Sequence, residues 1–163
     1  MYEWIRTVNE RADIELGTSS VAQKYMLLDV LVHLLRRAHF NCESQFPEVF
    51  SDYDITSRQL ALLLVIGQRP NSSQKAIGEM VALDVNTVSD TLRRMERKGL
   101  VRRAASLTDA RSICVSLTSK GFQLLEGADE DLQRLERRVV SNLDAGEEQQ
   151  LKDLLRKMMN ISL

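Results

Sequence analysis

The chain has 163 residues, of which 44% are hydrophobic, enough for one domain or for one domain with an added assembly element. Only 2 prolines and 7 glycines argue against a disordered chain and against an all-β sandwich, and the residue usage favours helices. The formal net charge is −1, but residues 56–125 hold 11 Lys/Arg and 5 Asp/Glu while both ends are acidic, a distribution that would draw a polyanion to the middle.

The N-terminal part is predicted to hold two helices. Residues 2–16 can form a short helix, which "GTSS" at 17–20 ends. Residues 21–44 carry an apolar stripe at the helical period, formed by Leu27, Val30, Leu31, Leu34, Leu35 and Ala38. We expect Pro47 to interrupt this helix and to begin a loop that runs to about Ile55.

A helix over about 57–67 is predicted next. Thr56 and Gln59 have the spacing of a capping box that would open it. Residues 67–73, "GQRPNSS", are expected to form a loop.

Two short helices joined by a tight turn are predicted after this loop, over about 73–81 and 85–98. Asp84 stands where an N-cap of the second helix is expected, and Gly99 stands where a left-handed C-cap residue would end it.

Residues 100–104 and 112–118 are predicted to be two strands, with 105–111 as the tip of a long hairpin. Thr118 can cap a long helix over 119–141. The pattern of this helix predicts an inner stripe of Leu125, Ala128, Leu132, Leu135 and Val139.

A last helix is predicted over 145–159. Residues 144–147, "DAGE", have the form of a capping box at its start. Its apolar residues are Leu151, Leu154, Leu155 and Met158.

The two helices over 73–81 and 85–98 have the form of a helix-turn-helix. On a helical wheel of the second, Val88, Leu92 and Met95 share a face that must be buried. The outer face carries hydroxyl, amide and guanidinium groups, which suit base edges and phosphates in a major groove, and the free amides of its N-terminus suit phosphate. The predicted DNA contacts in this motif are Ser73, Gln74, Asn86, Thr87, Ser89, Asp90, Arg93, Arg94 and Arg97.

The alternative for this face is an ordinary solvated helix surface that happens to carry arginines. The tight turn, the glycine after the helix and the hairpin that follows disfavour it. In that arrangement the hairpin is a wing. Arg111 is the predicted contact to an adjacent minor groove, Asp109 is expected to hold the shape of the wing, and Arg102 and Arg103 are expected to meet phosphates.

Several classes of protein are disfavoured. The 2 cysteines form no Cys-x-x-Cys motif, so neither a disulfide framework nor a metal site is expected. The 2 histidines leave little room for acid–base chemistry, and no catalytic triad or phosphate-binding glycine loop is present, so we expect no enzyme. The start of the chain lacks the features of a signal peptide and no apolar run is long enough to span a membrane, so we expect a cytoplasmic protein.

The middle of the chain resembles the winged helix-turn-helix of the MarR (multiple-antibiotic-resistance regulator) family of bacterial transcription factors. The matching motifs are "TVS" at 87–89, "RRMERKGLVRR" at 93–103, "DAR" at 109–111 and "LTSKG" at 117–121, and "DITSRQLALLLVI" at 54–66 resembles the helix that enters the motif. The resemblance covers roughly residues 27–160 in the order of elements.

The resemblance implies a homodimer that binds a pseudo-palindromic operator, with half-sites about one helical turn apart. It implies that residues 1–50 and 119–163 supply dimerisation helices and that residues 51–118 form the DNA-binding lobe. The apolar stripes of the terminal helices agree with this division, since they exceed what one small lobe can cover.

Asp90 departs from the family pattern, which often has a basic or polar group at this position. An aspartate there would repel phosphate. It could accept a hydrogen bond from cytosine N4, or it could orient Arg93 or Arg94, and we favour the second.

The resemblance further implies a small phenolic or carboxylate effector, with no other cofactor. His33, Arg36, Arg37 and Arg58 are the candidate effector residues, because an arginine at a helix junction can bind a carboxylate with two hydrogen bonds. Surface arginines that form intersubunit salt bridges are the alternative. Cys42 falls near the end of its predicted helix, whereas the reactive thiol of peroxide sensors that resemble the family falls near the start, so redox sensing is not favoured.

Together these features predict a mainly α protein with a small β-hairpin, a winged helix-turn-helix lobe and terminal dimerisation helices. The predicted function is that of a ligand-responsive transcriptional regulator, a repressor, that binds double-stranded DNA as a homodimer. The alternative is a winged-helix protein–protein interaction module without specific DNA binding. Its docking face should show apolar anchors, which this arginine-bearing face lacks.

Overall fold

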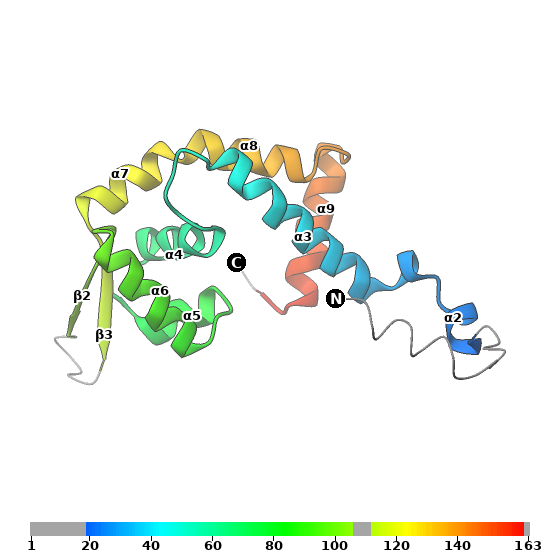
Figure 1. Cartoon of the computed structure of the whole chain (residues 1–163), viewed down its shortest axis with the longest axis horizontal. Coiled ribbons are helices and arrows are strands. Elements are labelled where there is room, and N and C mark those ends of the chain that lie inside the picture. Colours follow the sequence, from blue (N-terminus) through cyan, green and yellow to red (C-terminus); the bar gives the residue numbers. More distant parts are fainter. Residues whose placement is uncertain (1–18, 106–111, 162–163) are drawn as a thin grey trace, which may run out of the picture. The chain divides into compact units, whose positions relative to one another are not determined.

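The computed structural model of the chain describes residues 19–105 and 112–161 (Figure 1). The chain divides into two compact units, Met1–Phe40 and Asn41–Leu163, and the boundary between them falls inside the helix α3 (Leu31–Val49). The predicted helix near the start of the chain lies outside the described residues.

The first unit contains α2 (Ser20–Lys24), the 3-10 helix η1 (Leu27–Asp29) and the first part of α3. The prediction of one continuous helix over 21–44 is therefore wrong, since Tyr25 and Met26 adopt extended backbone angles between the two short helices. Neither α2 nor η1 buries a side chain, and a helix gains most of its stability from packing an apolar face.

Pro47 lies within α3, so the predicted interruption at this residue is also wrong. A proline inside a helix removes one backbone hydrogen bond. Packing offsets that loss here, because Phe46 and Val49 are buried and the ring of Phe46 stacks on that of Phe50 with centroids 4.4 Å apart. The loop that follows is correspondingly shorter and spans residues 50–56.

Three helices follow in the second unit: α4 (Ser57–Gln68), α5 (Gln74–Met80) and α6 (Val85–Arg97). Each begins after a residue whose side chain accepts hydrogen bonds from backbone N–H groups of the first turn, namely Thr56, Ser73 and Asp84. Gly99 has a φ of 72°, in the left-handed region that favours glycine. The predicted capping box of α4 and the predicted ends of α6 are confirmed.

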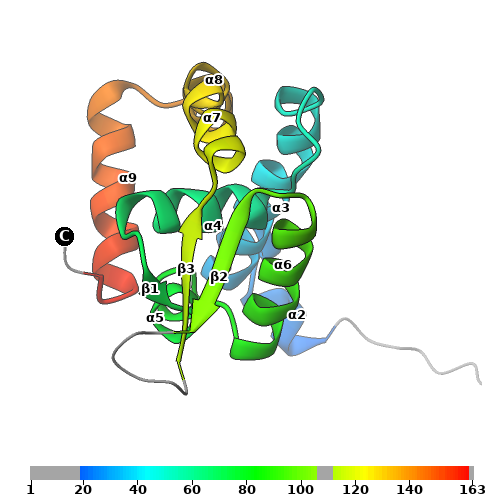
Figure 2. The ribbon, with the colours of Figure 1, turned by 90° about the vertical axis from the view of Figure 1, so that its left-hand side faces the viewer.

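A three-stranded antiparallel sheet with the order β1-β3-β2 lies beside these helices (Figure 2). Its strands are β1 (Ser72–Ser73), β2 (Val101–Ala105) and β3 (Ile113–Leu117). The two strands of the predicted hairpin, β2 and β3, are confirmed. β1 was not predicted, because it falls in a polar segment that has the composition of a loop.

The C-terminal helices are α7 (Ser119–Gly127), α8 (Asp129–Val139) and α9 (Ala145–Met158). The predicted cap of α7 and the predicted capping box of α9 are both present. The prediction of one helix over 119–141 is wrong, because the helix breaks at Ala128.

The break between α7 and α8 has two physical causes. The hydroxyl of Tyr53 donates a hydrogen bond of 2.8 Å to the carbonyl oxygen of Gly127, and a side chain that bonds to a helix carbonyl is a known cause of kinks. The three acidic residues 129–131 also occupy the first turn of α8, where carboxylates favour a helix start.

Two apolar clusters form the core of the second unit. The larger cluster joins α4, α5, α6 and the sheet through Leu62, Leu63, Ile66, Ile77, Val88, Leu92, Met95, Leu100, Val101 and Val115. The smaller one joins the end of α3 to α4 and the α7–α8 break through Phe46, Val49, Phe50, Leu60 and Ala128. The predicted mainly α fold with a small antiparallel sheet is confirmed. Over the described ranges, the chain has no helix with the length and apolar character to cross a membrane.

Candidate nucleic-acid interface

The turn between α5 and α6 is tight because the two helices approach closely. The N–H group of Leu83 donates to the carbonyl oxygen of Gly78 at 3.0 Å, and Ala82 has a φ of 52°. A Cβ atom at Gly78 would lie 3.1 Å from a methyl group of Val88, so only a residue without a side chain fits there comfortably. α5, the turn and α6 form the predicted helix-turn-helix.

The two faces of α6 differ as the helical wheel predicts. Val88, Leu92 and Met95 have no exposed surface. The predicted contacts of the outer face are exposed, namely Asn86, Asp90, Arg93, Arg94 and Arg97, whereas Thr87 and Ser89 at its edges are half-buried. The exposed face is therefore polar along the length of the helix.

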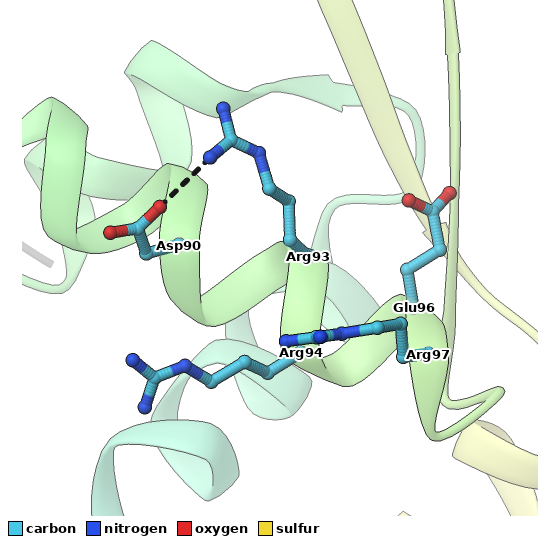
Figure 3. A pocket seen from close by; sticks show the side chains of 5 residues that line it. All are labelled: Asp90, Arg93, Arg94, Glu96 and Arg97. Atoms are coloured by element: carbon cyan, nitrogen blue, oxygen red, sulfur yellow. Dashed lines mark hydrogen bonds and ion pairs between the residues drawn. The ribbon is translucent and has the colours of Figure 1, made fainter.

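Three arginines line a concave surface on α6 together with Asp90 and Glu96 (Figure 3). Nη1 of Arg93 lies 2.9 Å from a carboxylate oxygen of Asp90, so Asp90 orients Arg93, as we favoured from the sequence. Among the described residues, Arg94 and Arg97 take part in no ion pair. Their guanidinium groups extend in the same direction in Figure 3, where both can meet a polyanion.

The N-terminus of α6 is not the open phosphate site that we expected. Asp84 accepts hydrogen bonds of 3.0 Å from the backbone N–H groups of Asn86 and Thr87 and one of 2.5 Å from the Thr87 hydroxyl. These bonds, with that of the hydroxyl foremost, lower the pKa of Asp84 below its ordinary value. Two amides are thus occupied and a carboxylate lies beside them, which disfavours phosphate at this end, and DNA contacts from Asn86 and Thr87 stay predictions.

The two arginines of β2 lie in different surroundings. Arg102 is exposed, as a phosphate contact requires. The side chain of Arg103 is only 14% exposed and is paired with Glu96 on α6. This placement favours a structural role for Arg103 over the predicted phosphate contact. Asp109 and Arg111 lie outside the described residues, so their roles in the wing stay predictions.

Ser73 and Gln74 stand at the start of α5, both half-buried. The hydroxyl of Ser73 accepts a hydrogen bond of 3.2 Å from the N–H group of Ala76. The side-chain oxygen of Gln74 is buried and has no hydrogen-bond partner in the described part of the chain. Ser73 therefore acts first as a helix cap, and a DNA contact from either residue stays a prediction.

Comparison with known proteins identifies the lobe. Residues 55–113 match the model of the MarR family. The transcriptional regulator HosA of Escherichia coli is 34% identical over 107 residues, which are 66% of this chain and 79% of HosA. The chain belongs to the MarR family. It is accordingly a DNA-binding transcription regulator with a winged helix-turn-helix fold.

Solved structures of MarR-family regulators superpose on the chain. Bordetella bronchiseptica BpsR, whose DNA binding is regulated by 6-hydroxynicotinic acid, gives a TM-score of 0.79 at 25% identity and covers 85% of this chain and 99% of its own. A mutant of E. coli MarR complexed with operator DNA gives a TM-score of 0.75 at 26% identity and covers 80% of this chain and 94% of its own.

The candidate effector residues of this MarR-family chain fall in both units. In the first unit His33 is half-buried, Arg37 is exposed, and the guanidinium carbon of Arg36 lies 5.2 Å from the ring centroid of Phe40. Arg58 belongs to the second unit and is exposed at the start of α4. Their grouping around one effector stays a prediction.

Cys42 is a free, half-buried cysteine. Burial raises the pKa of its thiol, which lowers the fraction present as the reactive thiolate. The raised pKa of the thiol therefore agrees with the position of Cys42 in the sequence, which also does not favour redox sensing.

Two residues that anchor the last turn of α6 were missed in the sequence. Nζ of Lys98 lies 3.0 Å from the carboxylate of Asp54 and donates to its carbonyl oxygen at 2.5 Å. Glu96 holds Arg103 of β2. The sequence carries a signal for the second pair, because Arg103 stands two residues after the core residue Val101 and so shares its face of the strand.

Proposed function

We propose that this MarR-family regulator is a repressor that binds a pseudo-palindromic operator as a homodimer and leaves it when a small effector binds. α6 would enter the major groove, and the hairpin of β2 and β3 would reach the minor groove. The observation that carries the proposal is the exposed face of α6, on which Arg94 and Arg97 have no acidic partner among the described residues. Such a face suits the edges and phosphates of duplex DNA.

Exposed apolar side chains support the homodimer. Leu151, Leu154 and Met158 repeat at helical spacing on α9 and are exposed. In the first unit, nine further large apolar residues of the described part are exposed, namely Val21, Tyr25, Met26, Leu27, Leu28, Leu31, Val32, Leu34 and Phe40. Within each unit, exposed apolar side chains in such number favour an interface, and a two-fold dimer would present two α6 helices to two half-sites.

A small phenolic or carboxylate molecule is the proposed effector. BpsR, a structural relative, is regulated by 6-hydroxynicotinic acid, which carries both a hydroxyl and a carboxylate on an aromatic ring. His33, Arg36, Arg37 and Arg58 remain the candidates to bind such a molecule. Aromatic hydroxy acids are therefore the first compounds to screen for release of DNA.

Fluorescence anisotropy on the intergenic DNA beside the gene of the protein tests the proposal. Titration in excess nonspecific DNA, at two salt concentrations, should show specific binding that weakens steeply with salt. A reporter gene behind the same DNA should be silenced by the protein and restored by an active effector. The proposal fails if the protein binds this intergenic DNA no more tightly than random DNA and if a genome-wide selection of bound DNA also finds no preferred sequence. That result would point to a protein partner instead.

The wing has its own test, which rests on the sequence alone. Replacement of Arg111 by alanine should weaken operator binding by about tenfold or more while the dimer persists, since one arginine in a narrow minor groove contributes strongly to binding. An unchanged affinity would remove Arg111 from the interface.

A further inference from the structure

Glu96 connects the last turn of α6 to the strand that leads into the wing. One carboxylate oxygen accepts a hydrogen bond of 3.1 Å from the backbone N–H group of Arg103. The other lies 3.7 Å from Nη1 of the same arginine. A single side chain of α6 thus holds both the backbone and the guanidinium group of a β2 residue.

Arg103 is directed inward by the alternation of β2. Val101, two residues earlier and on the same face, is almost fully buried in the core. The side chain of Arg103 is 14% exposed, and its Nε is buried with no hydrogen-bond partner in the described part of the chain. A mostly buried arginine depends on its acidic partner more than a surface arginine does, and among the described residues that partner is Glu96, whose own side chain is 41% exposed.

The Arg93–Asp90 pair on the same helix provides a contrast. Both of its side chains are 61% exposed, so water can replace either partner at little cost. Loss of Asp90 would leave Arg93 solvated and β2 untouched. Loss of Glu96 would remove the acidic partner that the described residues provide for Arg103, and it would also free the backbone of β2 from its contact with α6.

The carboxylate of Glu96 lies at the edge of the arginine-bearing surface of α6. Figure 3 shows it directed away from the guanidinium groups of Arg94 and Arg97. The carboxylate of Glu96 therefore pairs with Arg103 of β2 and does not pair with Arg94 or Arg97. β2 in turn carries the exposed Arg102 and continues into residues 106–111, which precede β3.

We propose that Glu96 is a positioning residue for DNA specificity, an inference that rests on the proposed operator binding. It fixes β2, and with it the wing, relative to α6, and it withholds the guanidinium group of Arg103 from phosphate. Without Glu96, Arg103 turns outward and becomes one more cation that binds any DNA. Specific binding then weakens because the wing and α6 no longer meet their two grooves together.

The test compares affinity for a selected operator with affinity for random duplex DNA, for the full-length chain and for Glu96→Ala. The operator is the sequence that the wild-type chain enriches from a random pool. In the variant we expect the ratio of the two affinities to fall by about tenfold. Affinity for random DNA should rise, and its dependence on salt should steepen by about one phosphate contact.

Two further variants separate geometry from charge. Glu96→Gln keeps an acceptor for the Arg103 N–H group and loses the charge, so its ratio should fall less. Arg103→Met removes the cation. The ratio of operator affinity to random-DNA affinity should therefore fall, but the affinity for random DNA should not rise. Glu130→Ala is the matched control, because it removes an exposed acid of α8 and should leave the ratio and the salt dependence unchanged.

A merely structural role predicts a different result. If Glu96 only stabilised the fold, both affinities would fall in proportion to the folded fraction measured by circular dichroism, and the ratio would persist. A general charge effect would raise both affinities equally. Either outcome would overturn the inference while leaving operator binding intact, whereas a wild-type ratio near one would overturn the operator proposal and this inference with it.

Discussion

Asp84 determines where α6 begins, because one carboxylate accepts the first N–H groups of the helix and the hydroxyl of Thr87. Its charge also disfavours phosphate at that end of the helix. In the proposed complex, the contacts of α6 with DNA would therefore come from the arginines of its later turns and from the short polar side chains of its outer face.

Replacement of Asp84 by alanine should lower the melting temperature by a few degrees at neutral pH, because an N-cap is lost. The pKa of Asp84 is lowered in the folded state, so its stabilisation is present above the ordinary aspartate pKa and is lost as the pH falls through the lowered value. The difference between the two proteins should therefore shrink in acid, as followed by circular dichroism. Asp84→Asn, which keeps an acceptor, should lose less stability. A difference that stays constant from neutral to acidic pH would contradict this account.

Arg94 and Arg97 should each contribute about one phosphate equivalent to DNA binding. In Arg94→Ala and in Arg97→Ala, the slope of log affinity against log salt should become shallower by about one. Fluorescence anisotropy at four salt concentrations measures this slope. Arg137→Ala, an exposed arginine of α8, is the control. An unchanged slope in both α6 variants would show that α6 does not face DNA phosphates.

At this scale the sequence predicted which residues of α6 are buried, because helical periodicity is a local property. It did not separate Arg102 from Arg103, although strand alternation with Val101 assigns them to opposite faces. The role of Glu96 was missed for a related reason. In the sequence, Glu96 stands among arginines and so has the pattern of a solvated helix face. Its contact with Arg103 becomes visible only when β2 is placed beside α6.

Among the elements, α7 makes close backbone contact with the residues that follow α6. The Thr118 side chain donates to the carbonyl oxygen of Gly99 at 2.6 Å and accepts from the N–H group of Gly121 at 3.1 Å. The backbone of α7 thereby comes so close to Leu100 that a Cβ at Gly121 would lie 1.9 Å from the Leu100 carbonyl oxygen. Such a contact cannot be relieved by a side-chain rotation, because it involves backbone.

Gly121→Ala should therefore destabilise the protein by about 3 kcal/mol, the upper range for forced overpacking. Gly127→Ala, in the last turn of the same helix, meets nothing within 4 Å and should stabilise it by about 0.5–1 kcal/mol through helix propensity. Chemical denaturation of both variants measures the two effects. Equal effects of the two substitutions would show that α7 does not approach Leu100 as described.

Helix caps were well predicted from the sequence, because a cap and its helix are neighbours in the chain. The break between α7 and α8 was not, since its cause is a hydroxyl contributed by Tyr53 from a distant loop. β1 was missed because a two-residue strand has no periodicity of its own. It exists through its pairing with β3, which comes more than forty residues later.

For the molecule as a whole, the acidic ends and the basic middle of the chain favour one orientation on DNA. The exposed apolar side chains of α9 add a second constraint, because a protein that carries them in water tends to cover them. Both features fit a dimer that offers its two winged lobes to one duplex.

Leu154→Glu should prevent the proposed dimer from forming. Leu154 is 56% exposed on α9, and a buried, unpaired carboxylate in an interface is strongly unfavourable. Sedimentation should report a monomer, and the melting temperature should lose its dependence on protein concentration. Gln149→Glu places the same charge at an exposed position on the opposite face of α9 and should leave the dimer intact. A dimer that persists in Leu154→Glu would exclude this face from the interface.

The pairing of β1 with β3 has a consequence for how the lobe opens. β3 is bonded on one side to the residues that enter α5, Ser72 and Ser73, and on the other to the strand that leaves α6. Each amide hydrogen of β3 faces one of these neighbours, so the whole strand exchanges only when both pairings open, and each pairing adjoins one helix of the DNA-binding motif. Hydrogen exchange should find the sheet and the two helices exchanging together as one cooperative unit, at the slowest rate in the lobe.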